Sequence, residues 1–198
     1  MNGSALDALL TETLQRIGKI AAPPVEATVS AATAQEAWGY RNKGMVPFAR
    51  NPEGRLVTGF YAPGSHTVVP FDRCPVQSER FDGVVRAARD WLSQRDAPVY
   101  DAAKETGWLK HLLTRTSSTG DTLVALVTTS GEGPNLAAFA RDLRNACPFV
   151  TSVFQNVNDR PGNVVLGPRW KPLGGKPHLE ESLMGLRFRL SPGAFFQV

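Results

Sequence analysis

The sequence predicts an α+β protein in which an antiparallel sheet of hairpins carries helices packed on one face. Amphipathic helical stretches alternate with pairs of short β-rich stretches, and turns rich in Asn, Asp, Gly and Pro join the members of a pair. The chain also contains 18 glycines and 15 prolines among 198 residues, which predicts many turns and short elements. Because no Gly-rich strand-to-helix phosphate loop is present, a nucleotide-binding parallel sheet is not expected.

The first element is an amphipathic helix. Apolar residues recur every three or four positions from Leu6 onward, and the pattern stops near Gly18. Residues 21–37 follow and are rich in Ala, Thr and Pro. Since Pro23 and Pro24 cannot continue a helix, we expect a linker or an extended segment there.

Two stronger helices follow, and strand-like runs surround them. Ser78 can cap a helix over Ser78–Gln94, and a second helix is expected over Asn135–Asn145, with Pro148 ending it. The predicted strands are Tyr40–Phe48, Leu56–Ala62, Leu109–Thr116, Thr122–Thr129, Val150–Val157, Asn163–Leu166, Leu179–Leu183 and Leu186–Leu190.

Composition narrows the class of protein. The 22 Lys and Arg exceed the 18 Asp and Glu by four, and 42% of residues are hydrophobic, which excludes collagen-like, coiled-coil and wholly disordered chains. No run of about 18 apolar residues occurs, and the N-terminus lacks the pattern of a secretory signal, so a cytoplasmic protein is expected. Two cysteines are too few for a disulfide framework.

The residues by themselves reveal no catalytic set. His66, His111 and His178 lie far apart without metal-ligand spacing. Neighbouring carboxylates at Glu180 and Glu181 would point to opposite faces of a strand, which makes them a poor acid–base pair.

Basic residues beside aromatic residues are more informative. Arg41 and Lys43 lie two positions apart on one predicted strand, so their side chains would share a face, close to Trp38 and Tyr40. A second group contains Trp108, Lys110, His111 and Arg115. Cations neutralise phosphates and aromatic rings stack on unpaired bases, so this pattern favours RNA binding. A solvated sheet face with its aromatic residues in the core explains the pattern equally well.

Trp38-Gly-Tyr-Arg-Asn-Lys43 is the first of five blocks that occur in order along the chain. It is similar to the Tyr-Arg-Asn-Lys signature of the bacterial RNA (uracil-5-)-methyltransferases, the family of 23S rRNA and tRNA m5U methyltransferases, and the other blocks resemble this family too. The resemblance runs from about Arg16 to the end. Its other blocks are Gly59–His66 with Val69–Gln77, Leu109–Arg115, Gln155–Asn158 with Asn163–Gly167, and Ser191–Val198.

The resemblance implies a domain plan. Members combine a central RNA-binding domain with a Rossmann-like domain that uses S-adenosylmethionine. By this comparison, residues 1–20 are an N-terminal helix, 21–178 the central domain, and 179–198 the first strand of a truncated catalytic domain. The cofactor loop, the nucleophilic Cys and the Glu base are missing from the sequence, so we expect that this chain alone does not methylate RNA.

Two positions match cofactor-binding residues of the family. Gln197 corresponds to a Gln that contacts the methyl donor S-adenosylmethionine. Cys74 corresponds to the fourth ligand of a [4Fe–4S] cluster that many members carry, but the sequence lacks the C-x5-C-x2-C run that supplies the others. Any cluster would therefore belong to the parent enzyme, and we expect neither cofactor in this chain.

The expected function is thus RNA recognition within a uracil-5-methyltransferase that binds a structured RNA, with rRNA favoured over tRNA. Arg41, Lys43, Lys110 and Arg115 would contact phosphates, with His111 in the same group, and Trp108 would either stack on a base or pack in the core. The alternative is a non-enzymatic protein-binding or scaffold domain that uses the same sheet.

Overall fold

The computed structural model describes residues 3–29, 38–162 and 164–196 and forms two compact units, Met1–Trp38 and Gly39–Val198. The first unit contains α1 (Gly3–Arg16). After α1 the chain turns back, and the Asp7 carboxylate accepts hydrogen bonds from the Thr28 hydroxyl and from the Thr28 backbone N–H, the latter at 2.9 Å. Among the described residues, no helix is long and apolar enough to cross a membrane.

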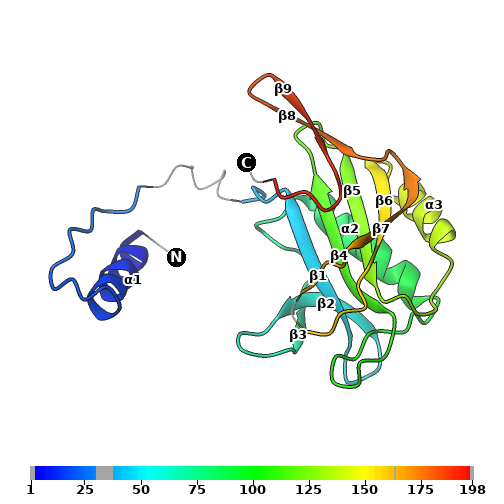
Figure 1. The fold of residues 1–198 in the computed structure, drawn as a ribbon, viewed down its shortest axis with the longest axis horizontal. Coiled ribbons are helices and arrows are strands. Elements are labelled where there is room, and N and C mark those ends of the chain that lie inside the picture. The colour runs from blue at the N-terminus through cyan, green and yellow to red at the C-terminus, as the bar shows by residue number, and fades with distance from the viewer. Residues whose placement is uncertain (1–2, 30–37, 163, 197–198) are drawn as a thin grey trace. The chain divides into compact units, whose positions relative to one another are not determined.

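The second unit is built on a seven-stranded sheet in the order β3-β2-β1-β4-β5-β6-β7 (Figure 1). Helices α2 (Glu79–Ser93) and α3 (Leu136–Ala146) pack on one face, as predicted. The strands are β1 (Lys43–Arg50), β2 (Leu56–Tyr61), β3 (Val68–Pro70), β4 (Leu109–Thr116), β5 (Thr122–Thr128), β6 (Val150–Val157) and β7 (Arg169–Gly175).

The sheet departs from the prediction in one pairing. β5 and β6 are parallel, whereas every other neighbouring pair in the sheet is antiparallel. The reason is the connection: α3 lies between β5 and β6 and carries the chain back across the sheet, which is the geometry that parallel neighbours require. The α+β class holds, but the sheet is mostly rather than wholly antiparallel.

The predicted strand Asn163–Leu166 is wrong for Val164–Leu166, whereas Asn163 lies outside the described residues. The Asn158 side-chain amide donates to the carbonyl oxygens of Val164 and Val165, at 2.6 and 2.8 Å, so this apolar run is held in a loop. On the side of β6 away from β5, the neighbouring strand is instead β7. Pro172 and two glycines within β7 weaken its strand signal, and such residues are tolerated because β7 lies at the edge of the sheet.

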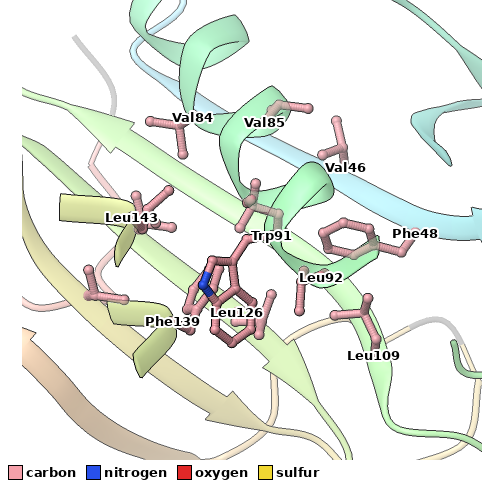
Figure 2. Packing of buried hydrophobic residues seen from close by; sticks show 14 of the residues in the cluster. Val46, Phe48, Val84, Val85, Trp91, Leu92, Leu109, Leu126, Phe139 and Leu143 are labelled. Carbon is pink, nitrogen blue, oxygen red and sulfur yellow. The ribbon is translucent and has the colours of Figure 1, made fainter. Parts of the chain in front are cut away.

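The main core lies between the helices and the sheet (Figure 2). On α2, Val84 and Leu92 are fully buried against residues such as Val46 and Leu109 of the sheet. The Trp91 ring meets the Phe139 ring of α3 edge-on, with centroids 5.2 Å apart. These contacts fix both helices on the same face of the sheet.

A smaller apolar cluster covers the opposite face, which we call the outer face. Residues 179–190 form a two-stranded antiparallel hairpin, β8 (Leu179–Leu183) and β9 (Leu186–Leu190). Leu179 and Leu190 of this hairpin are buried with residues of the outer face, including Leu113 of β4. The segment after β9, Ser191–Phe196, also lies on this side, and we call it the strap.

Candidate nucleic-acid interface

Arg41 and Tyr40 lie at the surface just before β1. The Arg41 backbone N–H donates to the carbonyl oxygen of Val76 at 2.9 Å, which fixes the backbone beside the segment that leads into α2. Both side chains are exposed, and the Arg41 guanidinium carbon is 6.0 Å from the centre of the Tyr40 ring. A cation over an exposed ring can serve a phosphate and a base together.

Lys43 is half-buried at the first position of β1. A Cβ at the next residue, Gly44, would clash with the Phe81 ring of α2, so Gly44 faces the helices and Lys43 faces the outer side of the sheet. Its register partner on β4 is Arg115. Burial, and then the charge of Arg115, lowers the pKa of Lys43 below its usual value.

Arg115 is buried beneath the strap, with only 3% of its surface exposed. Its Nη2 donates to the carbonyl oxygen of Ala194 at 2.6 Å. Its Nε and Nη1 are also buried, and among the described residues neither has a hydrogen-bond partner. Burial lowers the pKa of Arg115, and the charge of Glu181 opposes that shift. A guanidinium nevertheless remains charged at neutral pH.

Lys110 and Trp108 are buried as well. The Lys110 ammonium donates to the carbonyl oxygens of Asn158 and Arg160, at 2.9 and 3.2 Å, and lies 4.0 Å from the centre of the Tyr100 ring. Trp108 is 3% exposed and belongs to the main core. In this conformation Lys110 supports a loop and Trp108 fills the core, and neither side chain is exposed for contact with RNA.

His111 is mostly buried. Burial, and then the charge of Lys110, lowers its pKa to about 4. Its Nδ1 is buried without a hydrogen-bond partner among the residues that the structure describes. At neutral pH His111 is therefore uncharged and adds nothing to the positive surface.

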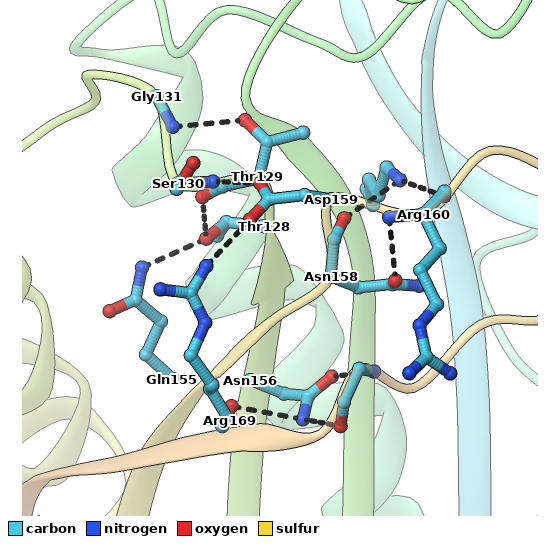
Figure 3. Close-up of polar contacts among 12 residues, drawn as sticks. Thr128, Thr129, Ser130, Gly131, Gln155, Asn156, Asn158, Asp159, Arg160 and Arg169 are labelled. Atoms are coloured by element: carbon cyan, nitrogen blue, oxygen red, sulfur yellow. Dashed lines mark hydrogen bonds and ion pairs between the residues drawn. The ribbon is translucent and has the colours of Figure 1, made fainter.

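A polar network fixes the loop between β6 and β7 (Figure 3). Asn156 binds Gly167 in both directions, since its amide donates to the carbonyl oxygen at 2.9 Å and its Oδ1 accepts from the backbone N–H at 2.7 Å. Asp159 accepts from the Ser130 backbone N–H and from the Arg169 guanidinium, both at 2.6 Å. The sequence block Gln155–Asn158 leads from β6 into this loop, but the sequence alone predicts no structural role for these side chains.

The described residues do not fit an iron–sulfur cluster. Cys74 and Cys147 are both free and buried. Within the described part of the chain, no group of three or more His, Cys, Asp or Glu side chains could hold a metal ion. A cluster of this type requires about four thiolates. Gln197, the predicted contact of the methyl donor, lies outside the described residues.

Comparison with curated proteins identifies RNA methyltransferases, although the chain matches no protein-family model. Uncharacterized RNA methyltransferases of Halalkalibacterium halodurans and Gloeobacter violaceus are each 35% identical over 188 residues, which are 94% of this chain and 40% of each relative. One from Bacillus cereus is 29% identical over 195 residues and 42% of its length.

A solved structure supports the fold. The tRNA (uracil-54, C5)-methyltransferase of Pyrococcus abyssi, in complex with S-adenosyl-L-homocysteine, matches all of this chain and 44% of its own, with a TM-score of 0.71 and 21% identity. The chain thus spans about two fifths of the length of the relatives that it matches. These matches show that the chain is homologous to RNA methyltransferases.

Proposed function

We propose that this chain is the RNA-recognition part of an S-adenosylmethionine-dependent RNA uracil-5-methyltransferase that acts on 23S rRNA. Homology to RNA methyltransferases supports the class of substrate. The observation that carries the proposal is the exposed Arg41 beside the exposed Tyr40, with Lys43 two residues further on at the start of β1. Cations and a ring in this arrangement suit an RNA backbone with unpaired bases.

In this role the sheet unit holds a folded RNA while one uridine is flipped out of its stack for reaction elsewhere in the enzyme. Residues 179–198 would begin the catalytic domain, where S-adenosylmethionine supplies the methyl group and Gln197 would contact it. Lys110 and Arg115, being buried, act in the first place by holding the β6–β7 loop and the strap.

Salt dependence tests this proposal against the alternative of a protein-binding scaffold. A gel-shift series with a structured 23S rRNA fragment should show affinity falling steeply as salt rises, because each phosphate contact releases counterions. In the Arg41→Ala, Lys43→Ala double variant, the slope of log K against log salt should fall by about 1 for each lost phosphate contact.

A matched control removes two cations elsewhere. Arg55 and Arg187 are exposed and lie away from this motif in the sequence. The Arg55→Ala, Arg187→Ala double variant also loses two positive charges, so its net charge equals that of the test variant. Equal losses in both double variants would indicate a general charge effect. Affinity that hardly changes with salt would favour the scaffold function.

A further inference from the structure

Two positive side chains face each other across neighbouring strands on the outer face. Lys43 of β1 and Arg115 of β4 are direct register partners, and the charge of Arg115 contributes to the lowered pKa of Lys43. Like charges directly opposite each other destabilise a sheet. Among the described residues, neither side chain forms an ion pair within 4.0 Å with a carboxylate.

Glu181 is the acid whose charge acts on Arg115, and its carboxylate already accepts other hydrogen bonds. The Glu181 carboxylate accepts from the backbone N–H of Ser118 at 3.0 Å and from that of Ser182 at 2.8 Å. It also accepts from the Ser118 hydroxyl. Glu181 therefore holds the hairpin to the turn between β4 and β5, and it influences Arg115 only through its charge.

Part of the Arg115 guanidinium has no hydrogen-bond acceptor among the described residues. Arginine carries five N–H donors, and Nε and Nη1 hold three of them. In the described part of the chain these two nitrogens have no acceptor, although both are buried. A buried charged donor without an acceptor is costly, so the arrangement favours an anion that would complete it.

We infer that Lys43 and Arg115 form a binding site for one phosphoryl group at the edge of the strap. Arg115 offers its free N–H groups from within, and the half-buried Lys43 offers its ammonium from the solvent side. Because Nε and Nη1 are buried and Nη2 binds the Ala194 carbonyl, this site requires the strap to shift when the anion binds. This inference rests on the proposed function, in which the phosphoryl group belongs to the RNA backbone.

Thermal unfolding of the 198-residue chain tests the site without RNA. Millimolar inorganic phosphate should raise the unfolding midpoint above that in chloride of the same ionic strength, because a ligand of the folded state stabilises it. Lys43→Met and Arg115→Met should each abolish this rise. Arg187→Met, which removes an exposed cation from β9, should retain it.

Two further measurements separate this site from a purely structural role. Phosphate should speed amide hydrogen exchange in Ser191–Phe196 of the wild type, but not of the Lys43→Met protein. A short oligouridylate should give the same responses at lower concentration if the natural ligand is an RNA phosphodiester, whereas equal potency of free phosphate would assign the site to a small anion.

The response to phosphate either supports or overturns the proposed site. A wild type that phosphate does not stabilise, or a rise that persists in Lys43→Met, would overturn the site. If Arg115→Met does not fold, Lys43→Met alone decides, because its side chain is half-exposed. A wild-type chain that responds to phosphate but does not bind the rRNA fragment would contradict the proposed function and support the phosphate site.

Discussion

At the scale of single residues, burial separates cations that look alike in the sequence. Arg41 is exposed, whereas Lys110 and Arg115 are 8% and 3% exposed. Their partners are backbone carbonyls 48 and 79 positions away, at Asn158 and Ala194. Local alternation of residue types predicts the strand, but it carries no information about which distant segment covers each side chain.

His111 gives a prediction at this scale. Its pKa in the folded state is about 4, below the 6.5 of an unperturbed histidine, so the unfolded chain binds more protons between these values. The stability that this histidine contributes is present above pH 6.5 and is lost as pH falls toward 4, by up to about 3 kcal/mol. Urea unfolding at several pH values measures this.

His111→Gln provides the comparison, because glutamine does not titrate in this range. As pH falls from 7 to 4.5, the wild type should lose more unfolding free energy than the His111→Gln variant. Parallel pH profiles for the two proteins would show that His111 is not held neutral by the fold.

At the scale of elements, helices were predicted well because their ends carry local signals. The predicted ranges Ser78–Gln94 and Asn135–Asn145 differ from α2 and α3 by one residue at each end. Strands that depend on distant partners were harder: β3 and β7 were missed, and the parallel pairing of β5 with β6 was not expected. Edge strands need little apolar alternation, so their sequences resemble loops.

The cap of α3 is the first prediction for an element. The Asn135 side chain accepts a hydrogen bond from the Ala138 backbone N–H at 3.1 Å. Asn135→Ala should lower the free energy of unfolding by about 1 kcal/mol, because that N–H loses its partner. Asn135→Asp, which also caps, should stay close to the wild type. Chemical denaturation measures both, and an equal loss in both variants would contradict the role.

The attachment of the β8–β9 hairpin depends on one buried carboxylate. Glu181, 4% exposed, accepts hydrogen bonds from Ser118 and Ser182. Glu181→Ala should destabilise the chain by about 1 to 3 kcal/mol, because the part-buried donors of Ser118 and Ser182 lose their charged acceptor. Glu180→Ala, at the exposed neighbouring position, should cost far less. Similar unfolding free energies for the two variants would remove this role from Glu181.

At the scale of the whole molecule, the sequence predicted the class of fold and the homology to RNA methyltransferases but not the cover of the outer face. The hairpin and strap that form this cover come from the last 20 residues, which the motifs alone assign to the start of another domain. Both apolar clusters lie entirely within Gly39–Val198. In the first unit, Leu6, Leu9 and Leu10 of α1 are exposed.

This division predicts that residues 39–198 fold without the first unit. A chain that begins at Gly39 should unfold in a single transition, with the same midpoint in urea as the full chain, because unfolding of the sheet unit exposes the same buried surface in both. Since Arg41 and Lys43 are retained, its salt-dependent rRNA affinity should also match that of the full chain. A lower midpoint would show that the first unit stabilises the sheet, whereas an unchanged midpoint with weaker binding would place part of the RNA contact before Gly39.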